Sequence, residues 1–241
     1  MADGRETTVY VVVHPRRATH MRVVCFEQPQ RLDHWCAASG RPEAIVAGFF
    51  VRRPWRPLGE VWIGGRAVAH EPIAPPFGPG RGCLHIAPSG AVVLAARREI
   101  AEVPLGDLIQ AGPMLVAGGR VLVDDDDREG FSAGAEQFDS DITVERHPRC
   151  ALGINEDELF AVCCDGRRTG VDAGLDLAEL ARLMVSVGAT DAINLDGGGS
   201  ATLVHRGHLL NRPYSSVDQP GPESRPVVTA LAFDPGRAPP P

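Results

Sequence analysis

The segment from Asp176 to Ser200 constrains the fold more than any other part of the chain. Asp176, with Glu179 three residues later, matches a capping box; apolar residues at helical spacing follow, and Gly188 ends the pattern. The next apolar run, AINL, is typical of a buried strand. The segment therefore predicts a helix, then a strand with Asp196 at its end.

Three consecutive glycines, Gly197, Gly198 and Gly199, follow Asp196, and Ser200 comes next. Each glycine costs backbone entropy, so an ordinary tight turn rarely contains three. The run is neither a P-loop, which needs a lysine and a following helix, nor a dinucleotide fingerprint, whose glycines are spaced. A carboxylate followed by free N–H groups and a hydroxyl is suited to hold a polar ligand. The alternative is a purely structural glycine-rich connection.

The remaining chain alternates short apolar runs with turns rich in glycine and proline, a pattern typical of antiparallel strands. The chain has 241 residues, of which 44% are hydrophobic, and it shows no repeat and no clean linker. We therefore predict one α+β domain over residues 7–233, with a central mixed, mostly antiparallel sheet and a few flanking helices. A disordered tail is expected at 234–241. Gly48 interrupts the apolar run EAIVAGFFV, which indicates close backbone approach there.

The overall charge excludes several classes of partner. A formal net charge of -7 leaves no basic surplus for nucleic acid or an anionic membrane. The first apolar run, Val9 to Val13, is too short for a signal peptide core or a membrane span. Six cysteines without a CxxC pattern indicate reduced thiols. We expect a cytoplasmic protein, and the oligomeric state stays open.

An acidic segment at residues 124–141 carries two partial motifs. Asp125, Asp127 and Glu136 nearly match a calcium-binding loop, but the flanking helices are missing from the pattern. We interpret the segment as a solvated loop and predict no cofactor, the alternative being a structural cation near these three acids. GFSAG matches a nucleophile elbow around Ser132, yet an elbow joins a buried strand to a helix. A serine hydrolase is therefore a distant alternative.

Arg149, Arg167 and Arg225 each lie near a turn that contains glycine, aspartate or proline. An arginine in such a place is usually a solvated charge. Three of them from separate segments can instead converge as a clamp for phosphate, because guanidinium groups bind phosphate oxygens in a bidentate manner.

Several long stretches of the chain form one recognisable set. The core runs from RCALGINEDELFAVCCDGR through the predicted helix to NLDGGGSATLV, and EAIVAGFF, AGPMLVAGGRV and NRPYSSVDQPGPESRPVVTAL lie around it. Together these stretches resemble the phosphodiester glycosidase family, and the helix with NLDGGGS is the most specific part of the similarity. The resemblance implies an α+β fold with a central mixed sheet. It also implies hydrolysis of a sugar 1-phosphodiester between the anomeric carbon and the phosphate oxygen.

The resemblance also implies a set of site residues. By position these are Arg149, Asp165, Arg167, Asn194, Asp196, Gly197, Gly198, Gly199, Ser200, Asn211 and Arg225; Gly48 is added as a binding residue. Arg149 and Arg225 would hold the phosphodiester, and the amides and hydroxyl of 197–200 would bind phosphate or sugar oxygens. Asp196 would be the nucleophile or general base, with Asp165 and Glu223 as candidates for a second carboxylate.

Two positions depart from the family pattern. Ala47 stands where an asparagine is frequent before the Gly-Phe-Phe run, and Cys150 stands where a threonine commonly follows the strand-opening arginine. These departures keep a second hypothesis open, in which the domain binds a sugar phosphate without cleaving it. Under the first hypothesis, the substrate is a small metabolite or a precursor of the cell envelope.

Overall fold

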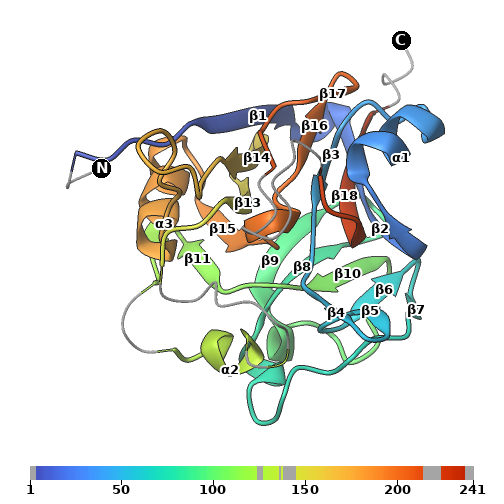
Figure 1. Ribbon diagram of the computed structural model, residues 1–241. Coiled ribbons are helices and arrows are strands. Elements are labelled where there is room, and N and C mark those ends of the chain that lie inside the picture. Colours follow the sequence, from blue (N-terminus) through green and yellow to red (C-terminus); the bar gives the residue numbers. More distant parts are fainter. Residues whose placement is uncertain (1–3, 124–126, 136, 138–144, 214–223, 237–241) are drawn as a thin grey trace.

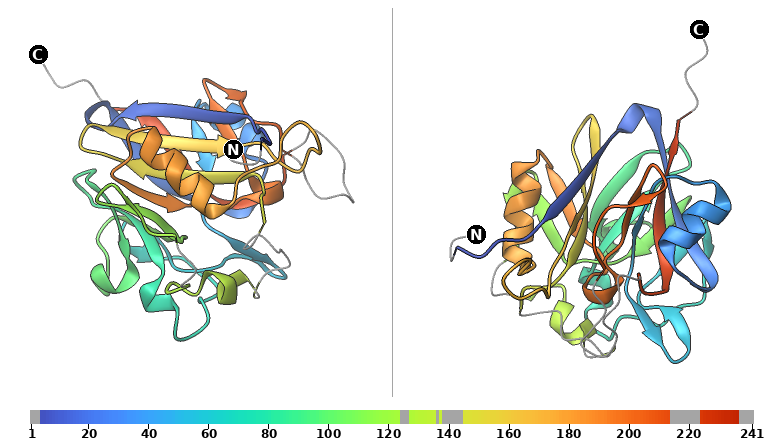
Figure 2. Two further views of the ribbon diagram at one scale, coloured as in Figure 1. Left: turned by 90° about the vertical axis from the view of Figure 1, so that its left-hand side faces the viewer. Right: turned by 45° about the horizontal axis from the view of Figure 1, so that its top comes forward.

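The computed structural model describes residues 4–123, 127–135, 137, 145–213 and 224–236. Within these residues, three sheets and one small hairpin surround a common core, with helices on the outside (Figures 1 and 2). The predicted α+β class with mostly antiparallel strands and few helices is confirmed. The strands are divided among several sheets, and the one parallel contact in the described residues is the bridge between Leu58 and Glu71.

The largest sheet has six strands in the order β1-β14-β13-β15-β11-β12. These strands are β1 (Val9–Pro15), β11 (Met114–Ala117), β12 (Arg120–Val121), β13 (Arg149–Ile154), β14 (Glu158–Cys164) and β15 (Asp191–Asn194). The predicted hairpin between β13 and β14 is confirmed, with Arg149 opposite Cys164 and Ile154 opposite Leu159. Every residue of β13 is buried, because the sheet is covered on both faces.

Two five-stranded sheets and one hairpin complete the β structure. One sheet, β7-β6-β10-β8-β9, comprises β6 (Val61–Ile63), β7 (Arg66–Ala67), β8 (Gly82–Ile86), β9 (Val92–Ala96) and β10 (Asp107–Gln110). The other, β17-β16-β3-β18-β2, comprises β2 (Thr19–Gln30), β3 (Ala44–Val46), β16 (Leu203–His205), β17 (His208–Leu209) and β18 (Val227–Pro235). The hairpin pairs β4 (Phe50–Arg52) with β5 (Trp55–Pro57).

The helices are short and lie outside the sheets (Figure 1). The α-helices are α1 (Leu32–Ser39), α2 (Phe131–Ala135) and α3 (Leu177–Ser186), and 3-10 turns occupy Arg16–Ala18, Gly78–Gly80, Arg97–Glu99 and Gly198–Ser200. Across the described ranges, none of the helices has the length and apolar character needed to cross a membrane.

Helix α3 forms as the sequence predicts and packs directly on the six-stranded sheet. The backbone N–H of Glu179 donates to the Asp176 carboxylate at 2.7 Å, and the Glu179 side chain accepts from the N–H of Asp176 at 3.2 Å. Such a cap contributes about 1 kcal/mol. A β-carbon on Gly153 of β13 would lie 2.5 Å from the terminal methyl of Met184. Glycine at this position therefore lets the helix lie close against the strand.

Cys163 and Cys164 belong to different cores. Their side chains point to opposite faces of β14, Cys163 into the core between the sheets and Cys164 into the core under α3. All six cysteines are unpaired, as predicted for reduced thiols.

The disordered tail predicted at residues 234–241 starts too early, because residues 234 and 235 belong to a strand. Strand β18 continues through Asp234 and Pro235, which pair with His20 and Thr19 of β2. The Asp234 carboxylate also forms ion pairs with Arg22 and Arg41, and these charges favour an ordered strand end. Residues 237–241 lie outside the described residues.

Candidate active site

A cavity of about 440 Å³ opens beside the carboxyl end of β15. Its lining combines two carboxylates, three guanidinium groups and the aromatic start of the β4–β5 hairpin. The lining residues are Phe49, Phe50, Val51, Arg52, Arg53, Glu71, Gln137, Asp196, Gly197, Ser200 and Arg225. Residues far apart in the sequence, from β4, from the end of β15 and from the segment before β18, therefore meet at one polar cavity.

Asp196 is held in place by backbone hydrogen bonds on both sides. Its N–H donates to the carbonyl of Ala47 at 2.8 Å, and its carboxylate accepts from the N–H of Gly197 at 2.8 Å. The Ser200 hydroxyl also hydrogen-bonds the carboxylate. Asp196 is only 7% exposed, so this acid lies at the inner end of the cavity.

Burial raises the pKa of Asp196 to about 6. The hydrogen bonds from Ser200 and Gly197 and the positive charges of Arg225 and Arg52 oppose this increase without cancelling it. A carboxyl group with such a pKa changes its protonation state close to neutral pH, which suits a nucleophile or a general base.

The glycine run is required because two guanidinium groups and a carbonyl lie against it. A β-carbon on Gly199 would lie 2.6 Å from an Nη of Arg225, and one on Gly198 would lie 3.2 Å from an Nη of Arg167. A β-carbon on Gly197 would lie 2.7 Å from the Pro148 carbonyl oxygen. The sequence predicted that another group would lie close to the backbone of the glycine run. In the structure, these groups include the side chains of Arg225 and Arg167.

Arg149 has a different environment from the other two arginines. It is 1% exposed, its Nε donates to the carbonyl of Leu175 at 3.0 Å, and an Nη donates to the carbonyl of Glu145 at 2.9 Å. Arg149 does not line the cavity. Arg167 and Arg225 approach the glycine run, whereas the Arg149 guanidinium bonds the backbone around the start of α3.

Asp165 is also engaged by the protein. Its carboxylate accepts from the N–H of Arg212 at 2.7 Å and from the Tyr10 hydroxyl at 3.2 Å. Burial raises the pKa of Asp165, and these hydrogen bonds oppose the increase. Asp165 does not line the cavity, and its contacts fix the chain that follows Asn211.

The two candidate asparagines and Gly48 support the backbone around the site. The amide of Asn211 donates to the carbonyl of Ala201 at 2.8 Å and accepts from the N–H of Leu203 at 2.9 Å. Asn194 donates to the carbonyl of Gly112 at 3.1 Å, and its buried Oδ1 has no hydrogen-bond partner among the described residues. The N–H of Gly48 donates to the Thr229 hydroxyl at 3.0 Å.

Several residues of the cavity were not predicted from the sequence. The most prominent are Arg52 and Arg53, which belong to the β4–β5 hairpin, and Glu71, the second carboxylate of the lining. The only sequence signal for them was the Gly-Phe-Phe run before Val51. Gln137 reaches the cavity because its side-chain amide bonds the backbone of Ala74 and Pro72.

Three other predictions concern the acidic segment and the segment before β18. Glu223, Asp125 and Glu136 lie outside the described residues. Asp127 accepts from the N–H groups of Phe131 and Ser132, and so caps the short helix α2. Among the residues that the structure describes, no group of three or more metal-ligating side chains is assembled. Ser132 is the second residue of α2, and this helix follows a turn, not a buried strand as an elbow requires.

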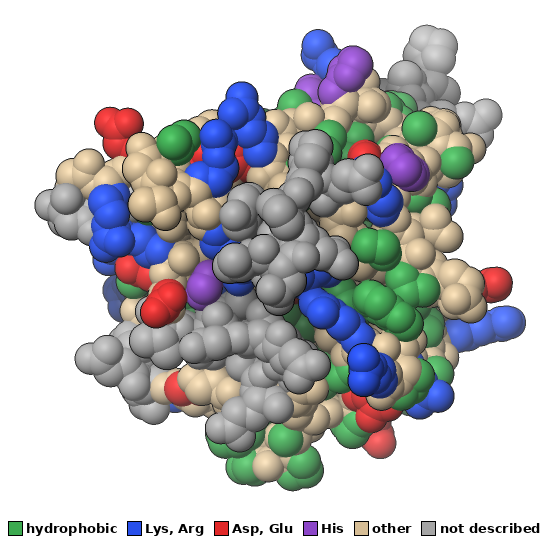
Figure 3. Space-filling model, in the orientation of Figure 1, with side chains coloured by type: hydrophobic (Ala, Val, Ile, Leu, Met, Phe, Trp, Pro, Cys, Tyr) green, Lys and Arg blue, Asp and Glu red, His purple; other side chains and the backbone are tan. Residues whose placement is uncertain are grey.

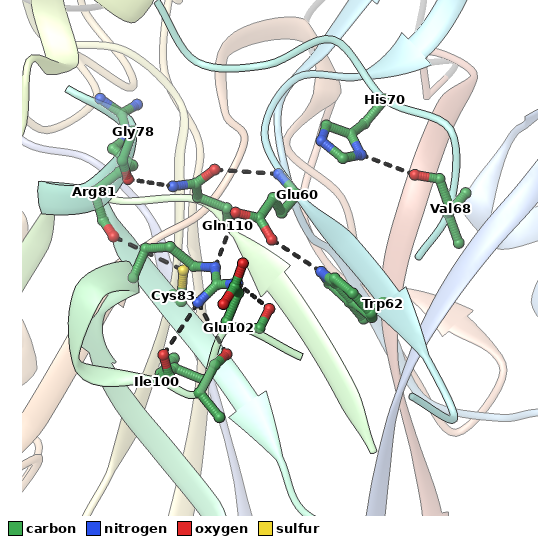
Figure 4. Close-up of polar contacts among 12 residues, drawn as sticks. Glu60, Trp62, Val68, His70, Gly78, Arg81, Cys83, Ile100, Glu102 and Gln110 are labelled. Carbon is green, nitrogen blue, oxygen red and sulfur yellow. Dashed lines mark hydrogen bonds and ion pairs between the residues drawn. The ribbon is translucent and has the colours of Figure 1, made fainter. Parts of the chain in front are cut away.

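A second cavity, about 520 Å³, lies beside Gln110 and Arg97. Figure 4 shows Gln110 between Gly78 and Glu60. Arg97 is already bonded: its Nε donates to Glu60 at 2.9 Å, and its Nη atoms donate to the carbonyls of Ile100, Ala101 and Glu102. Gln110 bridges the carbonyl of Gly78 and the N–H of Glu60. These polar groups stabilise the fold, so the first cavity is the better candidate site.

The fold and the cavity define an α+β protein of antiparallel sheets, with a buried carboxylate and several guanidinium groups at one site. Residues 40–234 match the phosphodiester glycosidase family, and the chain belongs to this family. It is 28% identical over 185 residues to the bovine (Bos taurus) N-acetylglucosamine-1-phosphodiester alpha-N-acetylglucosaminidase. That match covers 73% of this chain and 33% of the bovine protein, so the chain spans about a third of the relative's length.

Solved structures share the fold. The catalytic domain of the zebrafish N-acetylglucosamine-1-phosphodiester alpha-N-acetylglucosaminidase, auto-inhibited by its pro-peptide, aligns with a TM-score of 0.68 and 18% identity over 97% of this chain and 85% of that chain. A putative exported protein from Burkholderia pseudomallei aligns with a TM-score of 0.69 and 17% identity, over 94% and 74% of the two chains. A hypothetical protein from Synechocystis aligns with a TM-score of 0.68 and 18% identity, over 94% and 59%.

Proposed function

We propose that the protein is a hydrolase that cleaves a sugar 1-phosphodiester between the anomeric carbon and the phosphate oxygen. The observation that carries the proposal is Asp196, a buried carboxyl group with a pKa near 6, beside Arg225 in a cavity large enough for a sugar phosphate. Membership of the phosphodiester glycosidase family supports the same reaction. We further propose a small metabolite or a cell-envelope precursor as the substrate.

In the proposed reaction Asp196 acts on the anomeric carbon. Either its carboxylate attacks that carbon and water later releases the sugar, or it removes a proton from an attacking water. In both cases the bond from the anomeric carbon to the phosphate oxygen breaks, and the electron pair leaves with the phosphate. Phosphate is a good leaving group, so a strong general acid is not required.

The positive charge of Arg225 can stabilise the phosphate leaving group. A phosphodiester carries one negative charge, and the departing phosphate monoester gains a second as the bond breaks. A guanidinium group fixed beside that oxygen stabilises the developing charge without reorganisation. Arg225 lies against Gly199, and the backbone of the glycine run is therefore next to the phosphate in this arrangement.

The test is hydrolysis of a panel of sugar 1-phosphodiesters in water enriched in oxygen-18. Cleavage at the anomeric carbon puts the heavy oxygen on the released sugar, whereas attack at phosphorus puts it on the phosphate. We expect label on the sugar, and Asp196→Asn should lower kcat/KM by at least about a thousandfold. Label on the phosphate would refute the proposal.

Ser132→Ala serves as the matched control because Ser132 lies on α2 and outside the cavity lining. It should leave sugar release unchanged. Loss of activity in Ser132→Ala with retention in Asp196→Asn would favour the serine hydrolase instead. Binding of sugar phosphodiesters by the wild type, without release of sugar from any of them, would favour the non-catalytic alternative.

A further inference from the structure

The β4–β5 hairpin forms the outer rim of the candidate active site. Phe50 and Val51 at its start line the cavity, and the Phe50 ring stacks on Trp55 with centroids 5.4 Å apart. The backbone at its base is tied down, since the N–H of Leu58 donates to the carbonyl of Phe49 at 2.8 Å. The hairpin is therefore an ordered part of the cavity wall.

Two arginines at the tip of this hairpin, Arg52 and Arg53, are exposed and line the cavity mouth. In Figure 3, arginine side chains gather over the hairpin next to a hydrophobic surface. Within the described part of the chain, the side chain of neither arginine forms a hydrogen bond or an ion pair. Arg56 of the same hairpin differs, because it pairs with Glu71 at 3.4 Å.

Arg52 also lies close enough to the inner site to influence it. Burial lowers the pKa of Arg225, and the positive charge of Arg52 lowers it further. Like charges at one cavity repel each other, and this repulsion is relieved when an anion binds between them. The arginines of the cavity thus carry more positive charge than the single carboxylate at its inner end, Asp196, can neutralise.

The single negative charge of a sugar phosphodiester cannot neutralise all the arginines of this cavity. The diester carries a single negative charge, and Arg225 with the neighbouring Arg167 already provides cationic groups beside the glycine run. The reacting carbon must lie at Asp196, at the inner end. The group on the other side of the phosphate then extends toward the mouth, where the unpaired arginines of the hairpin lie.

We propose that Arg52 and Arg53 form a subsite for a second negative charge, carried by the alcohol component of the phosphodiester. This inference rests on the proposed function and specifies its substrate: a sugar 1-phosphodiester whose non-sugar side bears a carboxylate or a further phosphate. Guanidinium groups bind both kinds of anion.

The test compares substrates that differ only in this charge. The probes are one sugar 1-phosphodiester with a 2-carboxyethyl group, its uncharged 2-carbamoylethyl counterpart, and a third with a 2-phosphoethyl group. The wild type should cleave both anionic substrates with kcat/KM about tenfold higher than the neutral one at low salt. The advantage should shrink as the salt concentration rises, because exposed charges are screened.

The variants locate the subsite. In Arg52→Gln/Arg53→Gln the ratio of kcat/KM between anionic and neutral substrates should fall to about one. Arg56→Gln removes a charge from the same hairpin that already has a partner, and its ratio should equal that of the wild type. Thermal unfolding checks that each variant is folded, as expected for exposed side chains.

The outcomes separate this inference from the proposed function. Cleavage of the neutral substrate with no preference for the anionic ones overturns the subsite and leaves the glycosidase intact. A preference that survives in Arg52→Gln/Arg53→Gln also overturns it. Absence of cleavage of all three substrates counts against the proposed function itself, and the subsite falls with it.

Discussion

An Nη atom of Arg225 lies 2.6 Å from the point where a β-carbon of residue 199 would stand. The Arg225 side chain can therefore keep this position only if residue 199 is glycine. The contact joins the turn after β15 to the segment that leads into β18, and it places a cation beside Asp196.

Gly199→Ala should lower kcat/KM for sugar release by about a hundredfold, because the new methyl group must displace the Arg225 guanidinium. Gly78→Ala is the matched control, since a β-carbon there meets only the carbonyl oxygen of Ile73 at 3.8 Å. Steady-state kinetics of both variants measure the effect. Full activity in Gly199→Ala would show that the position of Arg225 is not important for the reaction.

Arg149 and Arg225 should have opposite effects on stability and activity. Arg149→Met removes hydrogen bonds to the buried carbonyls of Leu175 and Glu145, and should lower the free energy of unfolding by about 3 kcal/mol. Arg225→Met should change that free energy by less than about 1 kcal/mol, yet reduce kcat/KM by at least about a hundredfold. Urea unfolding and kinetics on both variants would reveal the reverse pattern if Arg149 were the phosphate ligand.

Asp196 should make the protein less stable at neutral pH. Its pKa is about 6 in the folded state and 3.8 in a model compound, so the folded state binds more protons between these values. The free energy of unfolding contributed by this group therefore falls as the pH rises from about 4 to 6. Asp196→Asn should be more stable than the wild type by about 2–3 kcal/mol at pH 8, with little difference at pH 4.

Urea titrations at several pH values measure this effect, with Asp157→Asn as the matched removal of an exposed carboxyl group. A difference between Asp196→Asn and the wild type that does not change with pH would contradict the assignment of the raised pKa to Asp196.

Arg52 should influence the pH at which kcat/KM rises on the acidic side of the pH profile. The reacting form of Asp196 is the carboxylate, so kcat/KM should rise about tenfold per pH unit below about 6 and level off above it. The positive charge of Arg52 lowers the pKa of Asp196, hence Arg52→Gln should move this limb upward by about half a pH unit. Arg66→Gln, on the separate strand β7, is the control. A downward shift in Arg52→Gln would contradict the proposed electrostatic contact.

Local structure was predictable wherever neighbours in sequence decide it. The capping box of α3, the β13–β14 hairpin and the position of Asp196 just beyond β15 all follow from periodicity and capping chemistry over short segments. The division of the strands among several sheets was not predictable, because it depends on which distant strands pair. The end of β18 was placed too early for the same reason, since its partner is β2.

Sequence patterns were enough to predict that this chain carries a carboxylate, a run of glycines and several arginines, and that the glycine run follows the end of a strand. Tertiary structure alone decided which arginines face that run and which hold the backbone, and it brought Arg52, Arg53 and Glu71 to the same cavity. Side-chain convergence depends on the packing of segments as distant in sequence as those of Arg52 and Arg225, and no local pattern encodes such packing.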